Sequence, residues 1–300
     1  MSLKELWSMG RDTVAAWIDD YAPSMGAALA YYTMFSIAPL LIIVIAVAGL
    51  VFGNDAAKGH VLAELRDVMG HEGAVAVEGL LKSASEPEKS SLAAIVGLVT
   101  LLVGATTVLG ELQSALDRIW RADTAPPAEG LWSWLRTRLL SLGMILTFGF
   151  LLLVSLVISA ALAALGKWWG PLFGGWDTVL QLINFAISFV IITLVFAIIY
   201  KSLPRVSVAW RDVWIGATVT ALLFTIGKVL IGLYLGRTST ASAFGAAGSL
   251  VVLLVWVYYS AQIFLLGAEF TWVYTHRRGS RAGGAAAPDG HGDAPDDVRQ

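Results

Sequence analysis

The sequence predicts an all-α, polytopic membrane helix bundle with six transmembrane helices. Two observations carry this prediction. Of the 300 residues, 57% are hydrophobic and only 14% are charged, with a mean hydropathy of +0.73, whereas soluble domains carry about 25% charged residues. In addition, six apolar runs each provide the roughly 20 helical residues that a bilayer crossing requires. These runs are continuous and do not alternate with polar residues, which excludes a β-barrel.

The order of the spans also predicts their orientation. The six spans are expected at residues 28–53, 92–112, 139–166, 179–203, 213–235 and 247–275. The segments on the side of the two termini hold 13 Lys and Arg residues, and the segments on the opposite side hold 6. Because positive side chains are retained on the cytoplasmic side, both termini are predicted to be cytoplasmic. An even number of spans agrees with that orientation.

The N-terminal region, residues 1–27, precedes the first span. It contains Val14, Trp17, Ile18 and Tyr21 at helical spacing, so that their apolar side chains share one face. This pattern is typical of an amphipathic helix at the membrane interface. The region is therefore predicted to be a cytoplasmic interfacial helix. No signal peptide is predicted in this region, so the first span is expected to direct membrane insertion.

Two regions remain: the 54–91 loop, which lies within the six-span domain of residues 28–275, and the C-terminal tail. The 54–91 loop holds seven acidic and four basic residues and a helical apolar pattern at Val61 and Leu65, which predicts a helical loop on the periplasmic side. Residues 276–300 are rich in Gly, Ala, Pro and Asp, a composition that cannot form a packed core. They are predicted to be a disordered cytoplasmic tail.

The first span opens with polar side chains and a proline, in the stretch ALAYYTMFSIAPLL at residues 28–41. Pro39 has no N–H, so the carbonyl of Phe35 loses its helical donor and needs another partner inside lipid. Tyr32, Ser36 and Pro39 lie on one helical face. The pattern predicts a helix kink at Pro39 with hydroxyl groups beside it. The kink either serves packing alone or forms the wall of a hydrated pathway.

Glu111 ends a stripe of small and polar side chains along the second span. The stripe comprises Ala93, Gly97, Thr100, Gly104 and Thr107. Small residues let membrane helices approach closely, because lipid supplies no hydrophobic force between them. The stripe therefore predicts a helix–helix seam that ends in an interfacial carboxylate. The functional alternative makes Glu111 the cytoplasmic end of a polar track.

Lys228 lies well inside the fifth span, about 10 Å of helix rise from its outer end. A lysine at that depth costs about 2.5–3.5 kcal/mol unless its amine reaches water. A snorkelling lysine is the simple interpretation. However, Lys228 shares its predicted face with Thr218, Ala221, Thr225 and Gly232, which favours a cavity or a paired acid over contact with lipid.

Polar residues also line single faces of two other spans. Gln262 and Glu269 share a face of the sixth span with Tyr258, and Asn184 lies on the fourth span between Gln181 and Ser188. These faces together suggest a polar interior in the bundle. The predicted pathway comprises Lys228, Glu269, Glu111, Gln262, Asn184, Tyr32 and Ser36.

Several classes of chemistry have no support in the sequence. The chain has no cysteine, which removes disulfides, thiolate catalysis and cysteine-ligated metals. It contains no HExxH, GxxxxGK[ST] or GxSxG motif. No catalytic, cofactor-binding or metal-binding residue is therefore predicted, and the chain is not expected to be an enzyme. The net charge of −2 argues against nucleic acid as a partner, and membrane lipids are the expected partners.

Several motifs resemble those of a known family, the YihY/BrkB family of bacterial inner-membrane proteins. The first-span motif of that family is similar to ALAYYTMFSIAPLL, and its short motif after the second span is similar to ALDRIW at 115–120, with Asp117 where Asn is common. The most specific resemblance is in Pro204–Glu269, through PRVSVAWRDVWIGATVTALLF, GKVLIGLYLG and FGAAGSLVVLLVWVYYSAQIFLLGAE. Matching positions are Tyr31, Pro39, Trp120, Pro204, Gly216, Lys228, Tyr234, Gly245, Trp256, Tyr258, Gly267 and Glu269.

The resemblance covers roughly residues 10 to 275 and implies a six-span protein of the bacterial inner membrane. It implies no agreed activity: members were once labelled ribonuclease BN, one member is linked to serum resistance, and a relative is linked to export of lipid A precursors. The residues and the resemblance together favour a passive or ion-coupled transporter of lipid or small solute. The alternative is a non-transporting assembly or scaffold protein of the cell envelope. An enzyme, including a ribonuclease, is the least favoured interpretation, and the oligomeric state is left open.

Overall fold

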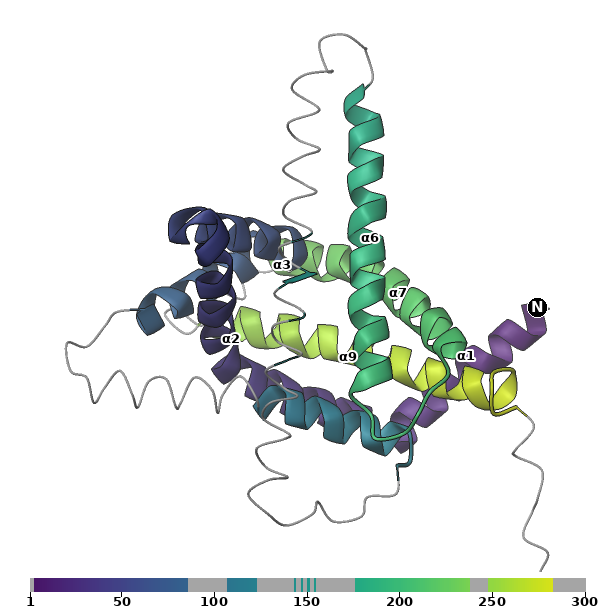
Figure 1. The fold of residues 1–300 in the computed structure, drawn as a ribbon. Coiled ribbons are helices and arrows are strands. Elements are labelled where there is room, and N and C mark those ends of the chain that lie inside the picture. The colour runs from purple at the N-terminus through teal and green to yellow at the C-terminus, as the bar shows by residue number, and fades with distance from the viewer. Residues whose placement is uncertain are drawn as a thin grey trace, which may run out of the picture.

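The computed structural model describes residues 3–85, 107–122, 176–237 and 248–282, with five isolated residues between 143 and 154. Regular structure in these ranges is helical throughout, in agreement with the all-α prediction (Figure 1). The helices are α1 (Leu3–Asp19), α2 (Ala22–Phe52), α3 (Asn54–Ser85), α6 (Trp176–Ser202), α7 (Trp210–Arg237) and α9 (Gly248–Arg277), and residues 107–119 form one more helix.

Three of the described helices are long and apolar enough to cross a membrane. They are Gln181–Ser202, Trp210–Leu235 and Leu250–Arg277, close to the predicted spans 179–203, 213–235 and 247–275. A fourth is α2, if its two halves Ala22–Ala38 and Leu40–Leu50, bent by 42°, count as one span. The bend lies at the position of Pro39.

The total of six spans is a prediction that the described residues do not test. Most of the predicted span 92–112 lies outside them, and so does 139–166 apart from the isolated residues. The described part of the second span is helical from residue 107 onward. The predicted disordered tail also lies outside the described residues beyond Ala282.

Helices α7 and α9 approach each other through a reciprocal pair of glycine–threonine contacts. A Cβ atom at Gly216 of α7 would overlap the side chain of Thr271 in α9, and a Cβ atom at Gly267 of α9 would overlap the side chain of Thr220 in α7. All four residues are buried. Small residues at both crossings therefore allow the close backbone approach that membrane helices use in place of hydrophobic attraction.

The small-residue face predicted around Thr218 is not the face that forms this seam. Thr218 is exposed, and its hydroxyl donates to the carbonyl of Trp214 at 2.8 Å. The buried residues Gly216 and Thr220 lie two positions to either side, which on a helix corresponds to a rotation of roughly 200°. The helix period places Thr218 opposite the face that contacts α9.

Tyr200 joins α6 to this pair of helices inside the core. Its side chain is fully buried, and its hydroxyl donates to the carbonyl of Phe264 at 2.8 Å and lies 3.1 Å from the hydroxyl of Thr220. Stacking against Phe196 and a tilted contact with Phe264 surround the ring. One polar side chain thus fixes the crossing of α6, α7 and α9.

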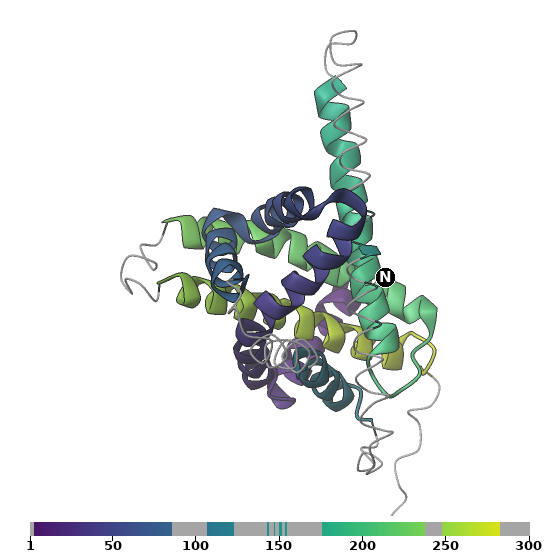
Figure 2. The same ribbon diagram turned by 60° about the vertical axis from the view of Figure 1, so that its left-hand side comes forward.

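Helix α3 follows α2 directly and folds back against the bundle. Its two parts meet at Gly70, where φ is 77°, a backbone conformation that favours glycine. Met69, Val77 and Leu81 are buried in a cluster with side chains from α2 and α9. Figure 2 shows the ribbon of α3 folded back beside α2. The segment predicted as a helical loop at 54–91 is helical up to Ser85 and is packed on the bundle; its periplasmic location remains a prediction.

The N-terminal helix α1 is held against the C-terminal end of α9. Asp12 forms an ion pair with Arg277, and the Nη2 atom of Arg278 lies 2.8 Å from Oε1 of Glu5. We call these two ion pairs the α1–α9 clamp. The outer face of α1 remains exposed, with Trp7 80% accessible, as an interfacial helix requires.

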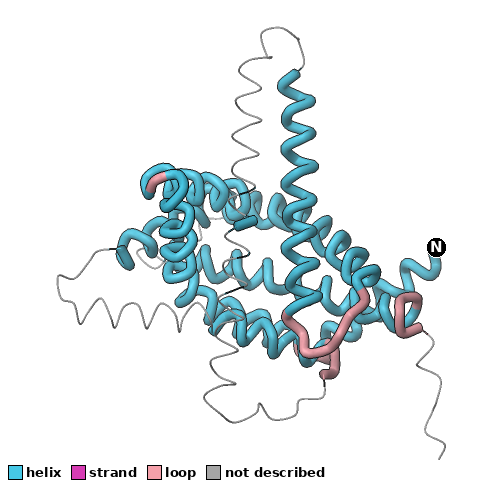
Figure 3. The backbone as a smooth tube through the Cα atoms, viewed as in Figure 1, coloured by secondary structure: helices cyan, strands magenta, loops and turns pink. Residues whose placement is uncertain are grey.

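The connection between α6 and α7, one of the pink segments in Figure 3, is hydrogen-bonded to the helix at 107–119. Asp117 is buried, and its carboxylate accepts the backbone N–H of Arg205 at 2.8 Å and faces the guanidinium of the same residue at 3.4 Å. Gln113 donates to the carbonyl of Leu203 at 3.1 Å. These bonds fix α6 relative to α7 and so help to shape the space between them.

Candidate functional site

A cavity of about 750 Å³ lies between the described helices, a volume typical of small-molecule sites. Every described helix except α1 contributes to its wall. Its lining residues are Leu29, Thr33, Glu64, Val108, Leu112, Gln181, Asn184, Phe185, Ser188, Ile191, Ile192, Val195, Phe196, Phe224, Lys228, Val257, Ser260, Ala261 and Phe264.

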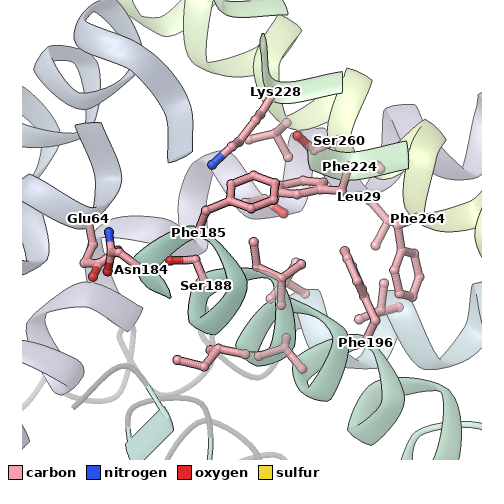
Figure 4. A pocket seen from close by; sticks show the side chains of 18 of the residues that line it. Leu29, Glu64, Asn184, Phe185, Ser188, Phe196, Phe224, Lys228, Ser260 and Phe264 are labelled. Carbon is pink, nitrogen blue, oxygen red and sulfur yellow. The ribbon is translucent and has the colours of Figure 1, made fainter. Parts of the chain in front are cut away.

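Most polar side chains of this cavity gather toward one end, with Phe185 among them. Figure 4 shows Lys228, Glu64, Asn184 and Ser188 toward one end of the cavity. Lys228 is half-buried and its amine points toward that end. Among the described carboxylates, none forms an ion pair with Lys228. The polar end therefore presents a cation that the described part of the protein does not neutralise by direct contact.

The opposite end of the cavity is aromatic and aliphatic. Phe196 of α6, Phe264 of α9 and Leu29 of α2 lie together there in Figure 4. Phe196 stands edge-on to Phe224, with ring centroids 5.7 Å apart. This end offers dispersion contacts and no charged side chain among the described lining residues.

Helix α6 connects the two ends. Its lining residues run from the polar Gln181 to the aromatic Phe196, which spans roughly 22 Å of helix rise. Asn184 and Phe185 are exposed, and the N-terminal half of α6 rises clear of the other described helices in both views (Figure 1 and Figure 2). Within the described part of the protein, the polar end of the cavity is thus the exposed end.

The cavity contains two of the seven residues of the predicted pathway, Lys228 and Asn184. The other five, Glu269, Glu111, Gln262, Tyr32 and Ser36, are not among its lining residues.

The positions of those five residues differ. Ser36 is buried and donates to the carbonyl of Tyr32 at 2.8 Å, while the Tyr32 ring packs edge-on against Tyr31. Gln262 packs so closely on α2 that a Cβ atom at Gly26 would overlap its amide. Glu111 is half-buried on the helix at 107–119, and Glu269 is fully buried in α9. The structure therefore divides the predicted set between the cavity and separate helix contacts.

Five polar lining residues are outside the predicted pathway. Gln181 and Ser188 flank Asn184 on the face predicted for the fourth span, whereas Glu64, Thr33 and Ser260 lie elsewhere. Glu64 belongs to an acidic segment that resembles a solvated loop, and acidic side chains are usually exposed. A signal was nevertheless present, because Glu64 lies three residues after Val61 and next to Leu65, within the apolar face of that segment. A carboxylate on a packing face is a candidate for a buried role.

Comparison with known proteins gives a consistent family assignment. A family model described as "Virulence factor BrkB" matches residues 13–291. A "UPF0761 membrane protein" from Stenotrophomonas maltophilia (strain R551-3) is 32% identical over 276 residues, which cover 88% of this chain and 60% of the relative. Another from Pseudomonas aeruginosa (strain LESB58) is 29% identical over 255 residues, which cover 84% and 59%. The chain thus spans about 60% of the length of these relatives. No solved structure matches it.

Proposed function

This chain belongs to the virulence factor BrkB family of membrane proteins, and from that premise we propose that it moves a lipid with a phosphate headgroup across the bacterial inner membrane, without chemical conversion of the lipid. The observation that carries the proposal is the cavity with Lys228 at its open polar end and phenylalanines at the other. A lipid has the same division into a charged head and an apolar chain.

The polar end suits an anionic headgroup. The lysine ammonium is a compact point charge with three donors, a common ligand of phosphate. Asn184 and Ser188 add an amide and a hydroxyl that can hydrogen-bond to headgroup oxygens. Because a lysine inside a membrane protein is costly, an anionic ligand at this position would reduce that cost.

The apolar end favours a lipid over a small ion or a polar solute. A pathway for a hydrated ion needs polar groups along its length, whereas Phe196, Phe264 and Leu29 offer none from their side chains. An acyl chain can pack against these residues while the headgroup stays at Lys228. In the mechanism that we propose, Lys228 captures the headgroup, which exchanges with the polar residues Ser188 and Asn184 of α6 while the chain remains in an apolar environment.

The test is lipid flux in liposomes that contain the purified full chain. Fluorescent phospholipids with anionic and with zwitterionic headgroups are compared, together with proton and cation leak. We expect Lys228→Met to lower lipid flux about tenfold, the effect of losing roughly 1.4 kcal/mol of stabilisation along the pathway. Lys58→Met is the matched control, because Lys58 is an exposed lysine of α3 that does not line the cavity.

Each result has a definite meaning. Flux that Lys228→Met removes and Lys58→Met preserves supports the proposal, and the better headgroup identifies the lipid class. Ion leak without lipid flux contradicts the lipid as cargo. Folded wild-type protein with no flux of any kind contradicts transport altogether and favours the assembly role, which crosslinking to envelope proteins would then examine.

A further inference from the structure

Glu64 gives the polar end of the cavity a second charge, opposite in sign to that of Lys228. Among the lining residues that the structure describes, these two are the charged ones. Both are half-buried. Val61 and Leu65, one turn before Glu64 and next to it on α3, pack against the buried cluster shared by α2, α3 and α9. The packing of its own helix turn therefore fixes the Glu64 carboxylate in the cavity wall.

The two charges reach the cavity from different helices and do not pair with each other. Glu64 belongs to α3 and Lys228 to α7, and these two helices are in contact. No ion pair joins the two described residues, so their charged atoms are further apart than the roughly 4 Å of such a pair. In Figure 4 the amine of Lys228 stands apart from Glu64. The polar end therefore offers a ligand one positive and one negative contact at separate positions.

A zwitterionic phospholipid carries the same two charges with opposite signs. Its phosphate is joined by a short linker to an ammonium group. Lys228 by itself suits the phosphate of any phospholipid, and Glu64 acts on the group beyond the phosphate. A primary ammonium has three N–H donors and a carboxylate has about four acceptor positions, so Glu64 can bind the ammonium and keep other contacts. Charge-assisted hydrogen bonds of this kind are roughly twice as strong as neutral ones.

Other headgroups suit this end of the cavity less well. An anionic phospholipid has no positive charge beyond its phosphate, so the phosphate would share the cavity with Glu64, and like charges repel strongly where water is scarce. A choline headgroup carries a quaternary ammonium, which has no N–H and is typically bound by a cage of aromatic rings. Glu64 attracts this charge but accepts no hydrogen bond from it. Specificity commonly combines an attractive contact for one ligand with repulsion of another.

We propose that Glu64 selects a zwitterionic phospholipid with a primary ammonium, of the phosphatidylethanolamine type, as the lipid that this cavity binds. This inference rests on the proposed function, in which Lys228 holds the phosphate. It assigns the ammonium to Glu64 and leaves Asn184 and Ser188 as neutral contacts of the headgroup oxygens. The order of affinity that follows is ethanolamine above choline, and choline above anionic headgroups.

The test measures binding and does not require transport. The purified full chain in detergent is mixed with equimolar phosphatidylethanolamine, phosphatidylcholine and phosphatidylglycerol, and native mass spectrometry identifies the lipids that remain bound. We expect the wild type to bind phosphatidylethanolamine about tenfold more tightly than phosphatidylglycerol, as one charge-assisted contact would provide.

Three variants separate the headgroup contacts. Glu64→Gln keeps the size of the side chain and removes its charge, so the preference for phosphatidylethanolamine should be lost. Lys228→Met should weaken binding of all three lipids by a similar factor, because each of them carries the phosphate. Glu78→Gln is the matched control and should keep the wild-type preference, because Glu78 is an exposed glutamate of α3 that does not line the cavity.

Several results would overturn the proposal. They are equal binding of phosphatidylethanolamine and phosphatidylglycerol by the wild type, a preference that survives Glu64→Gln, and a preference for phosphatidylcholine. If Glu64→Gln does not fold, competition in the wild type decides. Soluble phosphoethanolamine should then displace bound lipid at a lower concentration than glycerol 3-phosphate, and equal displacement would contradict selection by Glu64.

Failure of this inference and failure of the transport proposal give different results. Selective binding without flux in liposomes supports Glu64 as the selecting residue and contradicts transport. Lipid flux without a headgroup preference supports transport and contradicts selection by Glu64.

Discussion

Gly216 shows how a single missing side chain fixes the distance between two helices. A Cβ atom at this position would overlap the Oγ1 and Cγ2 atoms of Thr271, whereas a Cβ atom at Gly232, further along the same helix, would have no neighbouring atom within 4 Å. The two glycines share a helix and differ in what lies opposite them. Their replacement by alanine therefore separates helix propensity from packing.

We predict that Gly216→Ala destabilises the protein by about 1–3 kcal/mol, the usual cost of overpacking. Gly232→Ala should be neutral or stabilising by up to about 1 kcal/mol, because alanine favours the helix and meets nothing. Thermal unfolding of both variants in detergent checks the difference. Equal stability of the two variants would contradict the close α7–α9 approach.

Sequence analysis can identify a residue whose unusual character is visible in its own segment. It cannot identify a residue whose role depends on partners far away along the chain. Lys228 can be found because a charge inside an apolar run is visible in the sequence itself. The complete burial of Glu269 cannot be found in this way, because it depends on how α9 packs against its neighbours. Glu64 was not predicted as a lining residue for a related reason. Its position in the cavity wall depends on how α3 packs on the bundle.

At the scale of elements, the long apolar runs were sufficient to locate helices. The predicted spans 179–203, 213–235 and 247–275 agree with the apolar parts of α6, α7 and α9 to within three residues at every end. The contacts between helices required the structure, because the α7–α9 seam uses a face other than the one predicted around Thr218. Hydropathy fixes where a helix crosses lipid, but several faces of such a helix are equally apolar.

The α1–α9 clamp gives a prediction at this scale. Each ion pair is partly exposed and contributes at most about 1 kcal/mol, so loss of one should loosen α1 without unfolding the bundle. We predict faster amide hydrogen exchange in α1 for Asp12→Arg and for Arg277→Asp, and recovery of slow exchange when the two are combined. Absence of recovery in the double variant would show that charge pairing does not hold α1.

On the scale of the whole molecule, the clamp brings the N-terminal helix and the C-terminal end of α9 to the same end of the structure (Figure 1). An even number of membrane crossings between α1 and the end of α9 requires that both lie on the same side of the membrane. The charge distribution predicts that this end is cytoplasmic and that α3 lies on the opposite side.

We predict that an impermeant maleimide labels Lys58→Cys on intact cells and labels Gly10→Cys only after the membrane is opened. Both residues are exposed, and the chain has no cysteine of its own, so each variant carries a single reactive thiol. The reverse pattern would invert the topology. Labelling of both positions from outside would show that α1 and α3 lie on the same side.

The clamp also has a consequence for the order of events during synthesis. Asp12 and Arg277 are separated by 265 residues, and a ribosome adding about 5–20 residues per second needs roughly 13–50 seconds to cover that interval. Throughout this time α1 exists without the helix that will hold it. The ion pairs of the clamp therefore form only after Arg277 has been synthesised. A nascent chain interrupted before residue 277 has an N-terminal helix without these ion pairs, which distinguishes it from a finished chain.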